Sequence, residues 1–195
     1  MSPFEFVFSL LGLLLGLSLV EVLGGLARTL ETRLRLSRRQ QQDRGFRIGL
    51  LTPLLGVFLM LDLISFWRAA WIARDHLPAT GTGLFSGLLF TGSYYMAAHL
   101  VFPREIESEP DLDAHYFRVR RIVLATVLGL LALQMGFWLS VPELAAYFDK
   151  MPSLWVKLGL FASLLIAALL APGKRLNLLL LVLLVGYYLF DYVTF

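Results

Sequence analysis

The chain contains no cysteine and only a small share of charged residues. Without cysteine it forms no disulfide, holds no iron–sulfur cluster and performs no thiol catalysis. Charged residues make up 16% of its 195 residues, whereas soluble domains carry about 25%. The hydrophobic share is 58%, and the mean hydropathy is +0.74. A core this small cannot hide so many apolar side chains, so lipid must be the solvent for much of the surface.

Catalytic and cofactor-binding motifs are also missing. The sequence has no GxxxxGK[ST], HExxH or GxSxG pattern, and it has only three histidines: His76, His99 and His115. The Asp-Leu-Asp-Ala-His segment at 111–115 is better explained as part of a solvated acidic loop than as a cation site. No aromatic residues are interleaved with the basic ones, so we expect no nucleic-acid partner. The sequence therefore implies no cofactor and no metal.

What the chain does contain is six long apolar runs, which together predict a single transmembrane domain over residues 1–195. They cover residues 4–26, 48–72, 84–102, 122–141, 154–171 and 176–192. A helix rises about 1.5 Å per residue, so runs of about 20 residues cross the roughly 30 Å hydrocarbon layer. Because the runs are continuous rather than alternating, they exclude a β-barrel. The predicted fold is an all-α polytopic integral membrane protein, with six helices in one bundle.

The basic residues gather in alternate loops, and this predicts the orientation. Loops after the first, third and fifth runs hold Arg28, Arg33, Arg35, Arg38, Arg39, Arg44, Arg47, Arg104, Arg118, Arg120, Arg121, Lys174 and Arg175. The other side holds only Arg68, Arg74, Lys150 and Lys157. Basic loops stay in the cytoplasm, so both termini are predicted to be non-cytoplasmic. The four tryptophans fall at the outer helix ends, as an interfacial belt would.

One acidic residue, Asp62, lies near the middle of the second run. A charge there costs about 2.5–3.5 kcal/mol on insertion scales, so Asp62 should face the bundle interior and have a partner. Ser65 and Ala69 share its helical face, which suits burial. Asp62 is interpreted either as an ion or proton site or as a hydrogen-bonded acid that holds helices together. Both interpretations stay open on the sequence alone.

Two further polar pairs are predicted nearer the membrane surfaces. Glu21 and His99 would lie at a similar depth and could relay protons, because histidine titrates near neutral pH. The favoured interpretation is plainer: Glu21 reaches the interface and pairs with Arg28. On the outer side, Arg68 and Asp191 are candidates for an ion pair, although Asp191 also sits among tyrosines typical of an aromatic belt.

Small residues form two predicted packing seams. Gly12 and Gly16 lie four apart in the first run, and the third run carries a longer stripe of Gly83, Gly87, Thr91 and Ala98. Small side chains let helix backbones approach closely in lipid, where no hydrophobic drive joins helices. These seams would pack helices of one chain or of neighbouring copies, so a homo-oligomer or other membrane subunits are the expected protein partners.

The leading functional hypothesis is a small transporter or an ion- or proton-conducting protein. In it Asp62 binds the ion, while Tyr94 and Tyr95 line the route and Glu21 and His99 support it. The rival is a scaffold or accessory subunit of a larger membrane complex. A lipid-modifying enzyme would have to rest on Glu21, His99 and His115 and is the least favoured class. Small size and the absence of targeting signals favour a bacterial inner membrane.

The predicted orientation can be tested with epitope tags at the two ends of the chain. In spheroplasts, whose outer membrane has been opened, both tags should be accessible from outside, because the arginine-rich loops hold the opposite ends of the helices in the cytoplasm. A tag inserted near Arg104 is the matched control and should be reached only after the membrane is opened. A terminal tag that can be reached only from the cytosol would contradict the orientation.

Overall fold

The computed structural model describes residues 3–35, 49–77, 80–104 and 111–193. Within these ranges every regular element is a helix, and six helices are long and apolar enough to cross a membrane. They are α1 (Pro3–Arg35), α3 (Leu51–Ile72), α4 (Gly81–Val101), α5 (Leu112–Ser140), α7 (Ser153–Leu170) and α8 (Lys174–Val193). The predicted class, an all-α bundle with six potential membrane spans, is confirmed. Residues 36–48 of the arginine-rich loop and residues 105–110 of the acidic loop lie outside the described residues.

Two helices continue well past their apolar runs. α1 extends to Arg35 although its apolar run ends at residue 26, and α5 begins at Leu112 although its run begins at 122. Polar residues end a membrane span but not a helix, provided the backbone groups stay bonded. In α1 no proline interrupts the extension. In α5 the new start is capped, because the Asp111 carboxylate accepts the Asp113 backbone N–H at 2.8 Å.

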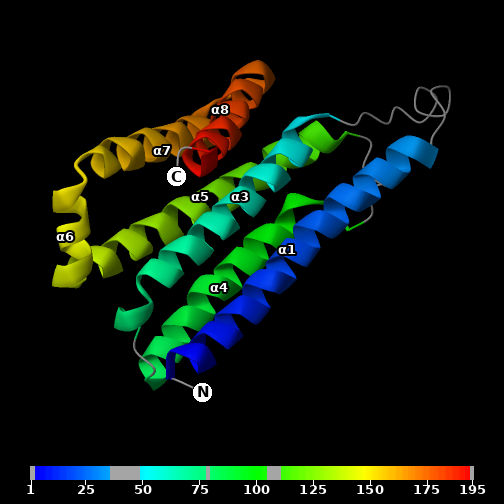
Figure 1. Cartoon of the computed structure of the whole chain (residues 1–195). Coiled ribbons are helices and arrows are strands. Elements are labelled where there is room, and N and C mark those ends of the chain that lie inside the picture. Colours follow the sequence, from blue (N-terminus) through cyan, green and yellow to red (C-terminus); the bar gives the residue numbers. More distant parts are fainter. Residues whose placement is uncertain (1–2, 36–48, 78–79, 105–110, 194–195) are drawn as a thin grey trace.

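Two short helices join spans at one end of the bundle. They are η1 (Arg74–His76) and α6 (Pro142–Lys150), and α6 falls where the sequence predicted only a connection. Pro142 suits a first helical position, because its fixed φ is already helical. Leu144 and Phe148, four apart on one face, are buried against Trp138. α6 therefore lies across the ends of α5 and α7 and closes the gap between them (Figure 1).

α3 is the central helix of the bundle. It packs against α1, α4, α5 and α8, while α7 lies beyond it against α5 and α8 (Figure 1). α1 and α4 run side by side in the same direction and share the most extensive contact between any two described helices. Because the chain runs back and forth, one end gathers the N-terminus, η1 and α6. We call it the α6 end and the opposite one the Arg-rich end.

At the Arg-rich end the start of α3 is held by α5 rather than by its own residues. Leu50 supplies no side-chain cap, and the Asp113 carboxylate instead accepts the Leu51 backbone N–H at 3.0 Å. The Thr52 hydroxyl donates to the Leu112 carbonyl at 2.6 Å. Lys174 of α8 pairs with the other oxygen of Asp113. One carboxylate thus accepts a backbone N–H group at the buried N-terminus of α3 and joins three helices.

The small residues of the predicted seams occupy several different environments. A Cβ on Gly12 would lie 2.9 Å from the Trp67 ring, and one on Gly87 would lie 2.8 Å from the Leu11 side chain. Gly16 has open space around it. The Gly83 backbone N–H donates to the capping Thr80 hydroxyl at 3.2 Å. Thr91 and Ala98 are buried, with the Thr91 hydroxyl donating to the Gly87 carbonyl.

A different pair of glycines makes room for an aromatic ring. The Phe102 ring, just past the end of α4, lies between Gly25 of α1 and Gly56 of α3. A Cβ on Gly25 would lie 2.3 Å from Phe102 Cγ and 2.8 Å from its Cβ, and a Cβ on Gly56 would lie 2.9 Å from Phe102 Cε2. These two glycines let one aromatic ring join three helices.

Gly25→Ala should destabilise the protein by about 1–3 kcal/mol, because the added methyl overlaps atoms of Phe102 close to its backbone. Thermal unfolding in detergent micelles measures the change, and Gly16→Ala is the matched control because its methyl meets open space. The loss should shrink when Phe102→Ala is combined with Gly25→Ala, because the overlap is removed. Equal effects of the two glycine substitutions would contradict the packing described here.

Candidate functional site

Asp62 lies midway along α3 and is only 5% exposed. The Tyr94 hydroxyl of α4 donates to its Oδ2 at 2.8 Å, and the Tyr188 hydroxyl of α8 donates to its Oδ1 at 2.5 Å. Each carboxylate oxygen therefore has a donor, and the two donors come from different helices. The acid faces the interior of the bundle and has partners, as the cost of an isolated charge in lipid requires.

Aromatic rings surround these three groups. Phe66 stacks on Phe90 with ring centroids 4.5 Å apart, and both rings lie against Tyr94. On the other side Phe161 of α7 packs edge-on to Tyr188 at 5.3 Å. An aromatic ring has a partly negative face and a partly positive edge. The surroundings of Asp62 are therefore apolar, yet they carry the quadrupoles of these rings.

A partly open cavity of about 410 Å³ leads from Asp62 towards the α6 end. It lies among α3, α5, α6, α7 and α8, with Tyr94 of α4 at its inner end, and Ser65 and Gln134 add a hydroxyl and an amide to its walls. Trp138 and Phe148 line it near α6. The volume falls within the roughly 300–1,000 Å³ typical of small-molecule sites, and its mix of apolar walls with a few convergent polar groups is typical of them too.

Three charged side chains line the cavity nearer the α6 end. The Asp191 carboxylate of α8 accepts two hydrogen bonds. Arg68 Nη2 donates to Oδ2 at 2.5 Å, and Lys157 Nζ donates to Oδ1 at 2.8 Å. The Arg68 guanidinium also lies 5.6 Å from the centre of the Tyr192 ring. Arg68 and Asp191, the predicted outer pair, are thus brought together. Lys157 of α7 joins them, so three helices meet at one carboxylate.

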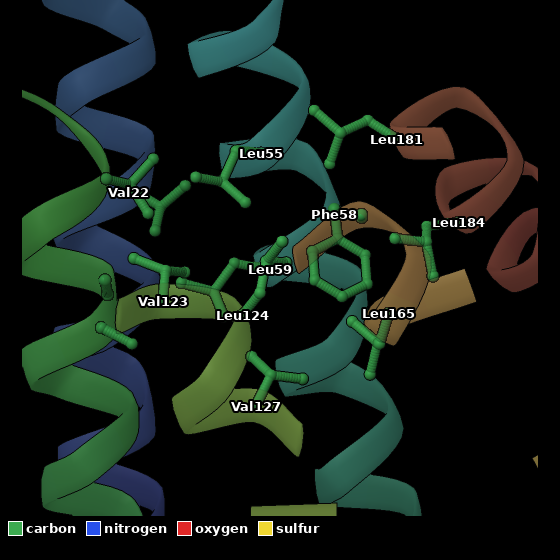
Figure 2. Close-up of a cluster of buried hydrophobic side chains, with 14 of the residues drawn as sticks. Val22, Leu55, Phe58, Leu59, Val123, Leu124, Val127, Leu165, Leu181 and Leu184 are labelled. Atoms are coloured by element: carbon green, nitrogen blue, oxygen red, sulfur yellow. The ribbon is translucent and has the colours of Figure 1, made fainter. Parts of the chain in front are cut away.

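Between Asp62 and the Arg-rich end the bundle is filled by packed apolar side chains. Phe58 and Leu59 precede Asp62 in α3, and they pack with Leu124, Leu165 and Leu184 in a cluster of fully buried side chains (Figure 2). Protein interiors packed in this way leave few voids larger than a water molecule. The described cavity therefore reaches Asp62 from the α6 end, and packed apolar side chains lie on the opposite side of this carboxylate.

A second polar network lies at the Arg-rich end, away from the cavity. Arg120 is 4% exposed, and its Nη1 donates to Asn177 Oδ1 at 2.6 Å and to the carbonyls of Ala168 and Ala171. The Tyr116 hydroxyl donates to the same amide oxygen at 2.8 Å. The two carbonyls end α7, and a cation is favourable at the C-terminus of a helix. Arg120 therefore acts as a cap for α7.

Glu21, His99 and Tyr95 come together on the α1–α4 pair, and none of them lines the cavity. His99 Nδ1 lies 3.5 Å from Glu21 Oε2, and the Tyr95 hydroxyl lies 3.5 Å from Glu21 Oε1. Glu21 and His99 are thus neighbours, as the proton-relay interpretation requires. That they relay protons stays a prediction. Tyr94 and Tyr95, grouped by the sequence, belong to separate clusters because adjacent residues point to different faces of a helix.

Several important residues escaped the sequence reasoning. In the sequence Tyr188 was grouped with an aromatic belt at the membrane surface, yet it is buried and contacts Asp62. The only sequence signal that Tyr188 faces the interior was its position three residues before Asp191, on the same side of the helix. Arg120 was counted among loop residues, although it is buried inside α5. Lys157 was noted only for its side of the membrane.

The remaining candidate from the sequence, His115, does not form part of a metal site among the described residues. His115 Nε2 lies 3.2 Å from the Leu100 carbonyl. Within the described residues no three His, Cys, Asp or Glu side chains are grouped to hold a metal.

Comparison with known proteins finds no family model, no curated protein and no solved structure that matches this chain. Function must therefore be argued from the cavity and its residues.

Tyr188→Phe should destabilise the protein by about 1–3 kcal/mol, because Asp62 Oδ1 is left buried without its donor. Tyr95→Phe is the matched control: its hydroxyl contact is long and part-buried, so the change should stay within about 0.5 kcal/mol. The triple variant Asp62→Leu, Tyr94→Phe, Tyr188→Phe should recover most of the loss, since removing all partners together leaves nothing unsatisfied. Equal stability of the two single variants, measured by thermal unfolding, would show that the contact contributes nothing.

Proposed function

We propose that the protein is a small membrane transporter that binds its solute in this cavity, with Asp62 as the charge-bearing group. The observation that carries the proposal is a cavity that starts at one end of the bundle and stops at a buried carboxylate halfway along a central helix. Ionisable residues at that depth are costly and usually mark ion or solute routes. A merely structural acid would not need an adjoining cavity of this volume.

The closed core below Asp62 favours a transporter over a channel. A channel needs a continuous path, whereas Phe58, Leu59 and Leu184 fill the bundle between Asp62 and the Arg-rich end. A transporter exposes its midplane site to one side at a time. This arrangement corresponds to a state open towards the α6 end.

The charge asymmetry supports a direction for that opening. With the arginine-rich segments held in the cytoplasm, the α6 end and both termini lie outside, so the cavity opens outward. We propose the inner membrane of a bacterium as its location, on the grounds given under Sequence analysis. The lipid bilayer is then its principal partner.

We expect Asp62 to exchange a proton during transport, so Asp62→Asn should reduce proton flux in proteoliposomes to the level of empty vesicles, because the amide can neither carry the charge nor exchange a proton. The readout is a pH-sensitive dye inside vesicles under an imposed gradient, across a series of external pH values. Asp75→Asn is the matched control: it makes the same change on an exposed side chain near the α6 end, outside the cavity, and should leave the flux unchanged.

Wild-type flux in Asp62→Asn would remove this residue from the mechanism. The proposal as a whole would fail if neither wild-type nor variant vesicles moved protons or solute.

The rival function, a subunit of a larger membrane complex, has one observation in its favour. Glu21 and His99 are each about one-third exposed, so polar groups face outward from the α1–α4 pair. A partner helix would cover them. Purification in a mild detergent separates the two functions: stoichiometric retention of another chain supports the complex, whereas an isolated chain that binds solute supports the transporter.

A further inference from the structure

We propose that the ligand of the cavity is a monovalent organic cation with an apolar body, such as a substituted ammonium or phosphonium ion. This inference rests on the transport function proposed above and names its substrate class. Three features carry it: the charges that line the cavity, the rings around its inner end, and its volume.

Among the described charged residues that line the cavity, Asp62 alone has no ionic partner. Arg68 and Lys157 each pair with one oxygen of Asp191, at 2.5 and 2.8 Å. These cations are also the more exposed, at 32% and 41%, so water screens them. Asp62 is held by two neutral hydroxyls and is almost fully buried. A ligand that compensates the buried charge carries one positive charge.

The rings near Asp62 favour the same sign. Phe66, Tyr94, Phe161 and Tyr188 line the inner part of the cavity, and Trp138 lines its wall nearer α6. The negative face of an aromatic ring attracts a cation, and the attraction is strongest where water is excluded. An anion would have to approach the Asp191 carboxylate, which already pairs with both cations.

The size and composition of the site favour an organic ion over a metal. Hard divalent cations take six or more oxygen ligands, and the described residues bring no three acidic or histidine side chains together. A cavity of about 410 Å³ instead holds a drug-sized molecule. Leu131, Leu154 and Leu158 of its wall would contact the apolar body of such a ligand.

The test compares two probes of matched size and shape but opposite charge, tetraphenylphosphonium and tetraphenylborate. Binding to the purified full-length protein in detergent is measured by calorimetry and by quenching of tryptophan fluorescence. The phosphonium should bind saturably, and Asp62→Asn should weaken it about tenfold or more, since an interaction with a buried charge is lost. Asp75→Asn should bind like wild type. The borate should show only the non-saturable uptake of a lipophilic ion into micelles.

A second measurement does not depend on the Asp62 variant folding. Because the chain has no cysteine, Ser65→Cys introduces a single thiol into the cavity wall, and Ser18→Cys introduces a matched one that is fully buried in α1. The phosphonium should slow labelling at position 65 in a saturable way, and the borate should not. Position 18 should stay unlabelled with either probe.

Saturable binding of tetraphenylborate, or phosphonium binding that is unchanged in Asp62→Asn, would overturn the inference. So would failure of the phosphonium to bind or to protect position 65. If any of these results came with flux that still requires Asp62, the substrate class alone would be wrong and the transport function would stand. Loss of both binding and flux in the wild type would remove the two together.

Discussion

Lipid offers no hydrogen bonds, so every polar group inside the bundle must find its partner within the chain. Asp62 is the most demanding case, and its two oxygens take hydroxyls from two different helices. That requirement fixes how α4 and α8 rotate against α3. The Tyr192 hydroxyl adds a bond to the Leu61 carbonyl one residue away, which strengthens the α3–α8 contact. The position of α8 in turn brings Asp191 to Arg68 and Lys157.

The same constraint is met differently at the Arg-rich end, where helix ends replace hydroxyls as partners. Asp113 accepts a backbone N–H from the start of α3, and Arg120 donates to carbonyls at the end of α7. An anion at a helix N-terminus and a cation at a C-terminus both follow the helix dipole. The two ends of the bundle thus differ in kind. One end is tied by backbone caps around a packed core, whereas the other is tied by side-chain ion pairs around a cavity.

Much of the fold could be predicted, because the bilayer constrains length and hydropathy strongly. Six apolar runs and the inward position of Asp62 follow from the cost of polar groups in hydrocarbon. The partners of Asp62 could not be predicted. A helix that is apolar on all sides carries no signal of its rotation, so Tyr188 could not be told from its neighbours on α8. Arg120 was misjudged for a related reason: charge marks the edge of the membrane, but it does not show where a helix begins.

The side-by-side arrangement of α1 and α4 has a consequence for biogenesis. The ribosome delivers α3 before α4, so the principal neighbour of α1 does not yet exist when α1 enters the membrane. During that interval α1 can pack against α3, and the surface of α1 that α4 covers in the finished bundle rests in lipid or against the insertion machinery. The contact between α1 and α3 can form first, and α1 completes its packing only after the third span has been delivered. A nascent chain interrupted before α4 would therefore leave this surface of α1 without the helix that covers it in the finished bundle.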